Sequence, residues 1–246
     1  MISAIILAAG KGTRLNSRKV NKVSLPFLGK PMIAYGVEAL WPVAQQIIVV
    51  VGAFSESVKQ ALKDYPVTYV HQYKRLGTGH AAMVGLKVVS SPTPSCVLVG
   101  YGDHMMFYTK DTIEKLIKLH KEKRATVSLV STFYDNPNEL AWGRIIRNPH
   151  GDVQDIIEQK DATESQRNIR EINPGFYCFD FEFLKKNFPK LKKSPVTKEY
   201  YLTDMIKMAV ALGKKVTALQ VPFSSVGIGV NRYEELAKSQ QYYSNR

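Results

Sequence analysis

The fold is decided near the start of the chain, at residues 6–22, which read ILAAGKGTRLNSRKVNK. An apolar run ends in this stretch, and a short apolar run bounded by glycine is typical of a buried β-strand. Successive backbone N–H groups in the turn around Gly10 and Gly12 can bind phosphate oxygens. Arg14 and Lys22 follow closely and could neutralise a bound phosphate. The stretch therefore predicts either a phosphate-binding turn or a purely structural one.

Two common nucleotide-binding motifs do not match this turn. A dinucleotide fingerprint needs a third glycine where the chain has Leu15, and an acidic residue near residue 30 that the chain lacks. A Walker loop needs Gly-Lys-Ser/Thr after a four-residue gap, and that pattern is missing too. The turn is therefore neither a Rossmann fingerprint nor a P-loop.

The composition is that of an ordinary globular protein. The 246 residues are 45% hydrophobic and 22% charged, and no apolar run approaches the roughly 18 residues that a membrane span requires. The apolar start lacks the basic region of a signal peptide. Cys96 and Cys178 lie far apart in apolar segments, which is typical of core thiols in a reducing compartment. We therefore expect a cytoplasmic protein with no membrane insertion.

The formal charge of +13 could attract polyanions. The lysines and arginines are scattered, however, and neither basic segment, 110–124 or 183–193, contains a recognised nucleic-acid module. We expect solvated basic faces and no nucleic-acid partner.

Apolar runs alternate with helix-period segments over the first half of the chain. The expected strands are 2–7, 46–51, 67–70, 95–99 and 125–132, and the expected helices are 32–41, 55–64, 77–89 and 111–123. This alternation predicts an α/β fold with a doubly wound, mostly parallel, Rossmann-like sheet that binds ligands at the carboxyl ends of its strands.

The pattern changes after Trp142. Strands at 144–147, 153–157 and 176–179 follow without long helices between them, and they predict a small antiparallel insert; helices at 198–212 and 233–243 flank a last strand at 216–221. No linker, repeat or low-complexity tract interrupts the chain. We therefore expect a single domain over residues 1–246.

Several polar residues follow the predicted strands. Asp103 suits a divalent cation held between protein and phosphates, or else it caps the next helix or shapes a turn. Gln72 offers the donor and acceptor that a pyrimidine edge requires, and Gly77 would let a ring approach the backbone. Thr78 fits the N-cap of a helix equally well, and we interpret His80 as a packed or capping residue.

The later polar residues are weaker candidates. Glu158 and Asn173 are suited to sugar hydroxyls or an acetamido group, and the amide oxygen of Asn231 is suited to a metal. Taken singly, each is more typical of a surface or a turn.

As an ordered set, the motifs resemble the sugar-phosphate nucleotidylyltransferases. The resemblance is strongest to the uridylyltransferase domains of bifunctional N-acetylglucosamine-1-phosphate uridylyltransferase/glucosamine-1-phosphate acetyltransferases. The matching segments are LAAGKGTR (7–14), Lys22 with GKPM after it, QALKD (60–64), LGTGHA (76–81), YGD (101–103), GRI (143–145), EQKDAT (158–163) with EIN (171–173), EYYLTD (199–204) and GVNR (229–232).

The resemblance implies transfer of UMP from UTP to a sugar-1-phosphate such as N-acetylglucosamine-1-phosphate, with Mg²⁺ as cofactor. It implies catalytic roles for Arg14, Lys22 and Asp103, and Mg²⁺ ligation by Asp103 and Asn231. Nucleotide binding is implied for Leu7, Ala8, Ala9, Gly10, Gly12, Thr13, Gln72, Gly77, Thr78, Tyr101 and Gly102, and sugar binding for Gly143, Glu158 and Asn173.

The chain departs from the family pattern at several points. Lys19 competes with Lys22 for the phosphate-binding role, and His104-Met105-Met106 follows YGD where a small residue and proline are usual. Trp142 and Pro174 also differ, so the sugar stays open. No hexapeptide repeat follows Asn231, so acetyl transfer is not expected and the oligomeric state is open. The alternatives are the same chemistry with another nucleotide, sugar or polyol phosphate, and a non-catalytic nucleotide-sugar-binding protein.

Overall fold

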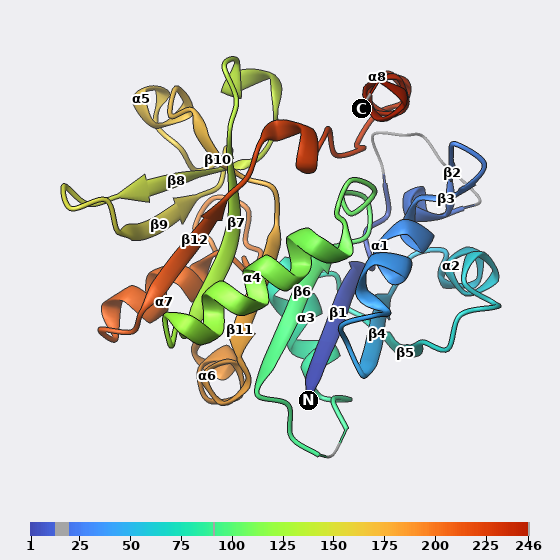
Figure 1. The fold of residues 1–246 in the computed structure, drawn as a ribbon, viewed down its shortest axis with the longest axis horizontal. Coiled ribbons are helices and arrows are strands. Elements are labelled where there is room, and N and C mark those ends of the chain that lie inside the picture. The colour runs from blue at the N-terminus through green and yellow to red at the C-terminus, as the bar shows by residue number, and fades with distance from the viewer. Residues whose placement is uncertain (13–19, 91, 246) are drawn as a thin grey trace.

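The computed structural model describes residues 1–12, 20–90 and 92–245. Within them, ten strands form one sheet with helices on both faces, and two short strands form a separate small sheet (Figure 1). The strands are β1 (Ile2–Ala8), β2 (Pro26–Phe27), β3 (Lys30–Pro31), β4 (Gln46–Val51), β5 (Thr68–His71), β6 (Cys96–Tyr101), β7 (Val127–Phe133), β8 (Gly143–Arg147), β9 (Val153–Ile157), β10 (Glu171–Asn173), β11 (Phe176–Asp180) and β12 (Val216–Gln220). The α-helices are α1 (Met32–Leu40), α2 (Ser55–Ala61), α3 (Thr78–Leu86), α4 (Lys110–Glu122), α5 (Glu164–Arg167), α6 (Phe181–Asn187), α7 (Asp204–Ala211) and α8 (Tyr233–Ser244).

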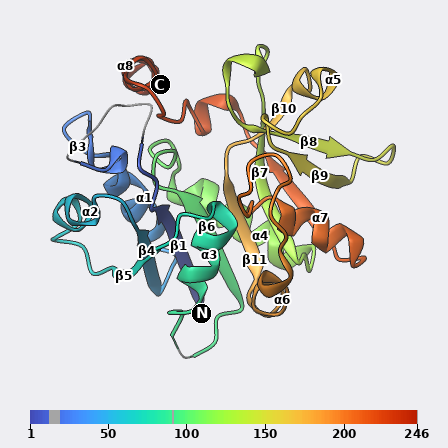
Figure 2. The ribbon, with the colours of Figure 1, turned by 180° about the vertical axis from the view of Figure 1, so that it is seen from behind.

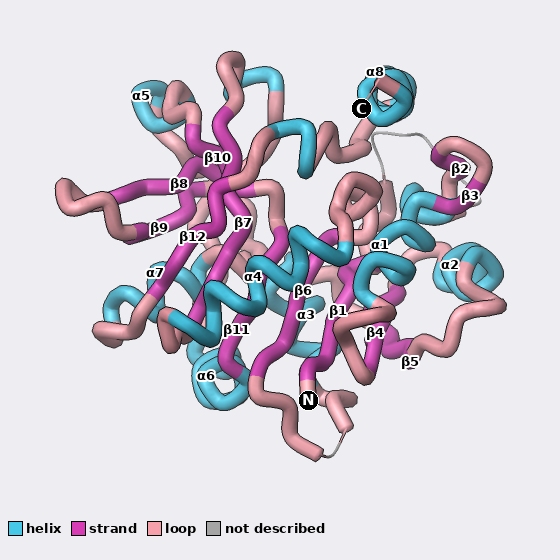
Figure 3. The backbone as a smooth tube through the Cα atoms, viewed as in Figure 1, coloured by secondary structure: helices cyan, strands magenta, loops and turns pink. Residues whose placement is uncertain are grey.

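The large sheet has the order β5-β4-β1-β6-β11-β7-β10-β8-β9, with β12 beside β7. Strands β5, β4, β1 and β6 are parallel and lie side by side (Figure 3). Strands β11, β10 and β9 run opposite to the others. The predicted fold class is confirmed: a mostly parallel sheet is extended by an antiparallel part, β8 to β10.

Strand β1 is buried on both faces, as its unbroken apolar sequence predicts. Ala4, Ile6 and Ala8 pack in the core that α1, α2 and α4 cover. Ile5 and Leu7 pack in the opposite core, which α3, α6 and α7 cover. Figure 1 shows α1 and α4 over one face, and Figure 2 shows α3 over the other. This two-sided packing fixes the carboxyl end of β1 at the upper edge of the sheet.

The helix predicted at 198–212 is shorter than expected, because α7 begins only at Asp204. The preceding residues use their backbone elsewhere: the N–H of Tyr200 donates to the Leu76 carbonyl at 2.7 Å, and the Tyr200 carbonyl accepts from Gly79 at 2.8 Å. Strands β2, β3 and β10 and helices α5 and α6 were not predicted. Cys96 and Cys178 are buried free thiols, as expected. No helix in the described residues combines the length and apolarity that crossing a membrane demands.

Candidate active site

The predicted nucleotide-binding residues gather at the carboxyl ends of the parallel strands. A cavity of about 510 Å³ lies there, next to the ends of β1, β5 and β6. Its lining includes the predicted residues Leu7, Ala8, Ala9, Gly10, Lys22, Gln72, Gly77, Thr78, Tyr101 and Asp103. The structure therefore brings together residues that are far apart in the sequence.

Five of the predicted or competing residues do not line this cavity or are not described. Gly102 packs beneath the cavity, where its N–H donates to the Leu7 carbonyl at 3.0 Å. Thr13, Arg14 and the competing Lys19 lie outside the described residues. Gly12 sits beside Lys22 with a φ of +63°, a conformation that favours glycine.

Asn21 holds the glycine turn in place. Its buried side-chain Nδ2 donates to the carbonyls of Ala8 at 3.0 Å, Gly10 at 3.0 Å and Ala53 at 2.8 Å. Its Oδ1 accepts from the N–H of Val23 at 3.2 Å. One amide thus ties the end of β1 to the loops on either side, and sequence reasoning did not identify it.

The LGTG loop is docked on the segment before α7. Gly77 has a φ of +101°, and a Cβ there would lie 2.5 Å from the Tyr200 carbonyl oxygen, so only glycine fits. Gly77 is the N-cap position of α3, and Thr78 is the first helical residue. The expected capping role of Thr78 is wrong, because its Oγ1 instead accepts from the N–H of Leu202 at 3.0 Å.

A second cavity, of about 180 Å³, adjoins the first and shares Thr78, Tyr101, Asp103 and Glu199 with it. It contains the three predicted sugar-binding residues Gly143, Glu158 and Asn173, together with Asn231, His104 and Trp142. The two predicted halves of the site therefore meet in space.

Lys22 lies close to the second cavity, between the two predicted metal ligands. Its ammonium is ion-paired with Asp103 and donates to Asn231 Oδ1 at 3.1 Å and to the Val230 carbonyl at 3.2 Å. The alternative of Asp103 as a helix cap is wrong, because Thr109 is the N-cap of α4. The Asp103 carboxylate and the Asn231 amide oxygen thus both contact one positively charged group, the Lys22 ammonium.

The described residues contain no group of three or more His, Cys, Asp or Glu side chains that could hold a metal ion. This does not disfavour Mg²⁺, which commonly uses one or two carboxylates and takes its other ligands from substrate phosphates and water. Hard oxygen donors that converge on an ammonium ion are chemically suited to such a cation. Asp103 and Asn231 therefore fit Mg²⁺.

The polar groups of the second cavity are partly engaged with the protein. Glu158 Oε1 accepts from Thr203 Oγ1 at 2.9 Å, and burial raises the pKa of Glu158. Asn173 Nδ2 donates to the Tyr177 hydroxyl at 2.6 Å, and its Oδ1 accepts from Gly175 at 3.1 Å. Each side chain keeps spare hydrogen-bonding capacity for a ligand.

His104 and Trp142 form an aromatic wall of this cavity. Their ring centroids lie 4.2 Å apart, and 5% of the His104 surface is exposed. Burial lowers the pKa of His104 to about 4, so the imidazole is neutral at physiological pH. These two residues depart from the family pattern, and they line the same cavity as the predicted sugar-binding residues.

Comparison with known proteins identifies the family. A family model described as nucleotidyl transferase matches residues 3–225. The chain belongs to the nucleotidyl transferase family. Among curated relatives, it is 39% identical over 239 residues to the bifunctional protein GlmU of Caldicellulosiruptor saccharolyticus, covering 96% of this chain and 50% of the relative. The GlmU of Psychrobacter sp. is 39% identical over 238 residues, with the same two coverages.

The chain thus spans about half the length of the curated relatives it matches. Among solved structures, a UDP-glucose pyrophosphorylase complexed with UDP-glucose aligns over 100% of both chains with a TM-score of 0.79 and 19% identity. A putative glucose-1-phosphate thymidylyltransferase from Bacillus anthracis aligns over 98% of this chain and 94% of that chain, with a TM-score of 0.78 and 19% identity. These likenesses confirm that the nucleotidyl transferase fold extends through the chain.

Four polar residues that were not predicted from the sequence also line the first cavity: Lys11, Asn21, Arg75 and Glu199. Lys11 and Glu199 belong to motifs that were recognised, LAAGKGTR and EYYLTD, so motif membership was the available signal. Asn21 and Arg75 precede Lys22 and LGTGHA directly, and no pattern marked them.

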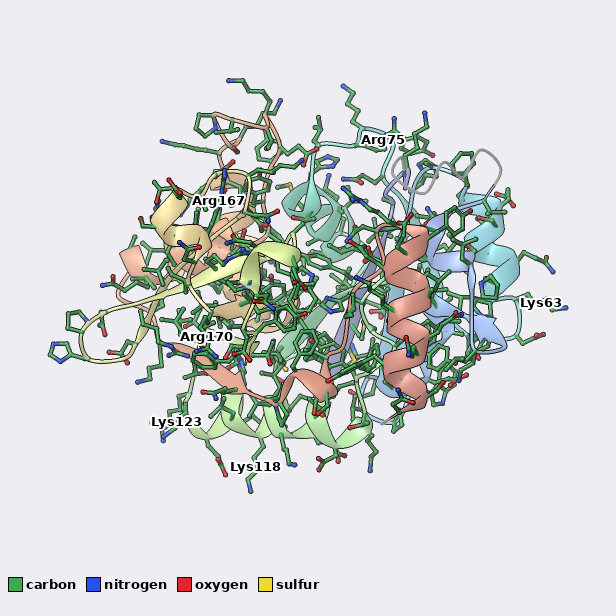
Figure 4. The ribbon with its side chains drawn as sticks, turned by 90° about the horizontal axis from the view of Figure 1, so that it is seen from above. Lys63, Arg75, Lys118, Lys123, Arg167 and Arg170 are labelled. Carbon is green, nitrogen blue, oxygen red and sulfur yellow. The ribbon has the colours of Figure 1, made fainter. Side chains whose placement is uncertain are left out.

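The labelled basic side chains do not all lie on one side of the molecule. Lys63 and Arg75 project from two different sides, and Lys118 and Lys123 project from a third, along α4 (Figure 4). Arg75 alone among these four lines the first cavity. Apart from Arg75, the labelled basic residues line neither of the two cavities.

Acidic groups near Glu158 predict a pH dependence of stability. Burial, with Asp155 nearby, raises the pKa of Asp204 from 3.8 to about 6. Between pH of about 4 and 6 the folded state binds a proton that the unfolded state has lost, so stability falls as pH rises through this window. Asp204→Asn is expected to raise the free energy of unfolding at pH 7.5 by roughly 1 kcal/mol. The rise of the Asp204 pKa from 3.8 to about 6 alone would correspond to a larger gain, but solvent screens this partly exposed carboxyl.

Urea unfolding at pH 4 and pH 7.5 tests this expectation. The gain from Asp204→Asn should vanish at pH 4, where the wild-type carboxyl is protonated in the folded state. The matched control is Asp111→Asn in the first turn of α4, an exposed position that should change stability by less than about 0.5 kcal/mol. An equal gain at both pH values would contradict the assignment.

Proposed function

We propose that this nucleotidyl transferase transfers UMP from UTP to a sugar-1-phosphate, most simply N-acetylglucosamine-1-phosphate, and releases pyrophosphate. The observation that carries the proposal is the junction of the two cavities at Asp103. A base-reading wall with Gln72 lies on one side, and Glu158 and Asn173 lie on the other. The GlmU relatives and the structural neighbour that holds UDP-glucose support the same reaction class.

The sugar is the finer part of the proposal. Glu158 and Asn173 favour a hydroxylated or acetamido ligand. The adjacent, mutually tilted rings of His104 and Trp142 favour, as a second candidate, the same reaction with another sugar or polyol phosphate, because they alter the wall of the second cavity.

The chemistry requires positioning and charge neutralisation. An oxygen of the sugar phosphate attacks the α-phosphorus of UTP, the bond from this phosphorus to the bridging oxygen breaks, and pyrophosphate leaves with that electron pair. The attacking oxygen is already anionic, so no general base is needed. Lys22, with Arg14 from the glycine-turn motif, neutralises the phosphates, and Gln72 and Gly77 hold the base.

Mg²⁺, when held by Asp103 and Asn231, supplies charge neutralisation at the phosphates. Lys22 occupies the space between those oxygens in the structure. For Asp103 and Asn231 to hold a cation, the Lys22 ammonium would have to give up both contacts, and it would then be free to contact the phosphates.

Lys22→Met is expected to strengthen Mn²⁺ binding in the absence of nucleotide by at least about tenfold, because it removes a competing positive charge. The same variant should weaken binding of Mg²⁺–UTP. Electron paramagnetic resonance of added Mn²⁺ measures the first effect, and calorimetry measures the second. Lys11→Met is the matched control, since exposed Lys11 lines the first cavity without an ion pair to Asp103; unchanged Mn²⁺ affinity in Lys22→Met would argue against this cation exchange.

The direct test is pyrophosphate release with UTP, CTP, GTP, ATP and dTTP, each combined with several sugar-1-phosphates. We expect UTP with N-acetylglucosamine-1-phosphate to give the highest kcat/KM. A preference for GTP or CTP would reject uridylyl transfer. Tight UTP binding without pyrophosphate release for any acceptor would instead favour a non-catalytic binding protein.

A further inference from the structure

The amide of Gln72 has two partners at one end. The side chain is buried, with 4% of the residue exposed. Its Nε2 lies 3.2 Å from the Gly77 carbonyl oxygen and 2.8 Å from Nδ1 of His80. Both partners belong to the start of α3, so the amide is held against the same element that bounds the first cavity.

The Gly77 carbonyl decides which amide atom faces His80. A carbonyl oxygen can only accept a hydrogen bond, so the amide atom beside it must be the nitrogen. His80 Nδ1 then presents its lone pair to the second amide hydrogen, and the ring proton lies on Nε2. Burial, followed by the nearby charge of Lys87, lowers the pKa of His80 and favours this neutral form.

With both amide hydrogens engaged, Oε1 is the free end of Gln72. It has no hydrogen-bond partner among the described residues, and Gln72 lines the first cavity. We propose that His80 is a positioning residue for base recognition, which fixes the amide so that Oε1 accepts from the N3–H of uracil and opposes the N3 lone pair of cytosine. The inference rests on the proposed uridylyl transfer.

A purely structural role for His80 makes a different prediction. Its ring stacks on Tyr200 with centroids 6.5 Å apart, and loss of this contact would loosen the loop for every nucleotide alike. A positioning role instead changes the ratio of affinities for UTP and CTP, because only the orientation of the amide distinguishes the two bases.

Two variants separate these roles. His80→Asn keeps an acceptor near the position of Nδ1 and loses the ring, whereas His80→Phe keeps a ring and loses the acceptor. Calorimetry with Mg²⁺–UTP and Mg²⁺–CTP gives the preference for UTP, which is the Kd of CTP divided by the Kd of UTP, for each protein, and thermal unfolding verifies that each is folded.

We expect His80→Asn to keep the wild-type ratio within about threefold and His80→Phe to lower it by at least about tenfold, which corresponds to roughly 1.4 kcal/mol. The inference is overturned if His80→Phe keeps the wild-type ratio or weakens both nucleotides equally. If the wild-type protein binds UTP no more tightly than CTP, the proposed uridylyl transfer is itself rejected. The wild-type measurement alone shows this, before either variant is studied.

Discussion

Asp103→Asn is expected to slow pyrophosphate release by at least about 10²-fold, the usual loss when a preorganised electrostatic group is removed from an active site. The carboxylate lies at the junction of the two cavities and is paired with the Lys22 ammonium. The amide that replaces it keeps the shape and loses the charge, so it holds neither Lys22 nor a divalent cation as firmly. Steady-state pyrophosphate release with saturating UTP and sugar phosphate measures the effect.

Asp64→Asn is the matched control, because Asp64 is exposed and remote from both cavities. It should leave turnover unchanged, and both variants should unfold near the wild-type temperature. Turnover of Asp103→Asn within a few-fold of wild type would remove Asp103 from the catalytic set.

Asn21→Asp is expected to lower the free energy of unfolding by about 2–4 kcal/mol. The substitution keeps the size of the side chain and the acceptor for Val23, but it turns an oxygen toward the carbonyls of Ala8, Gly10 and Ala53. Buried acceptors without donors are costly, and a charge in the same place adds to that cost. Urea denaturation gives the change directly.

The same loosening of the glycine turn should weaken UTP binding in Asn21→Asp. Asn136→Asp is the control, because Asn136 is exposed and makes no side-chain cap on the short helix that follows it. If Asn21→Asp lowers the free energy of unfolding no more than Asn136→Asp does, the Asn21 amide does not stabilise the three carbonyls that it contacts.

Local pattern was sufficient to predict most of the sheet. The strand predicted at 46–51 has the bounds of β4, and the strand at 153–157 has those of β9, because buried strands carry apolar runs. The helix predicted at 198–212 began too early, since residues 199–202 bind the LGTG loop through their backbone. That pairing joins segments more than 120 positions apart, and no local pattern contains it.

The candidate site was predicted less completely than the sheet. The position of Asp103 after a buried strand indicated a functional edge, whereas its approach to Asn231 came only from the family resemblance. The roles of these residues remain predictions. Asn21 could not be found, because its importance depends on three carbonyls that meet only after folding.

The docking of residues 199–203 has a consequence for how substrate preference can change. Tyr200 and Leu202 hold the LGTG loop through Leu76, Thr78 and Gly79. One residue further on, the Thr203 hydroxyl donates to Glu158, which lines the second cavity. Under the proposed function, a change of acceptor preference that moved this short segment would therefore alter nucleotide preference as well. We expect acceptor preference to be more freely altered at His104 and Trp142, which line the same cavity and make no hydrogen bond to residues 199–203 among the described residues.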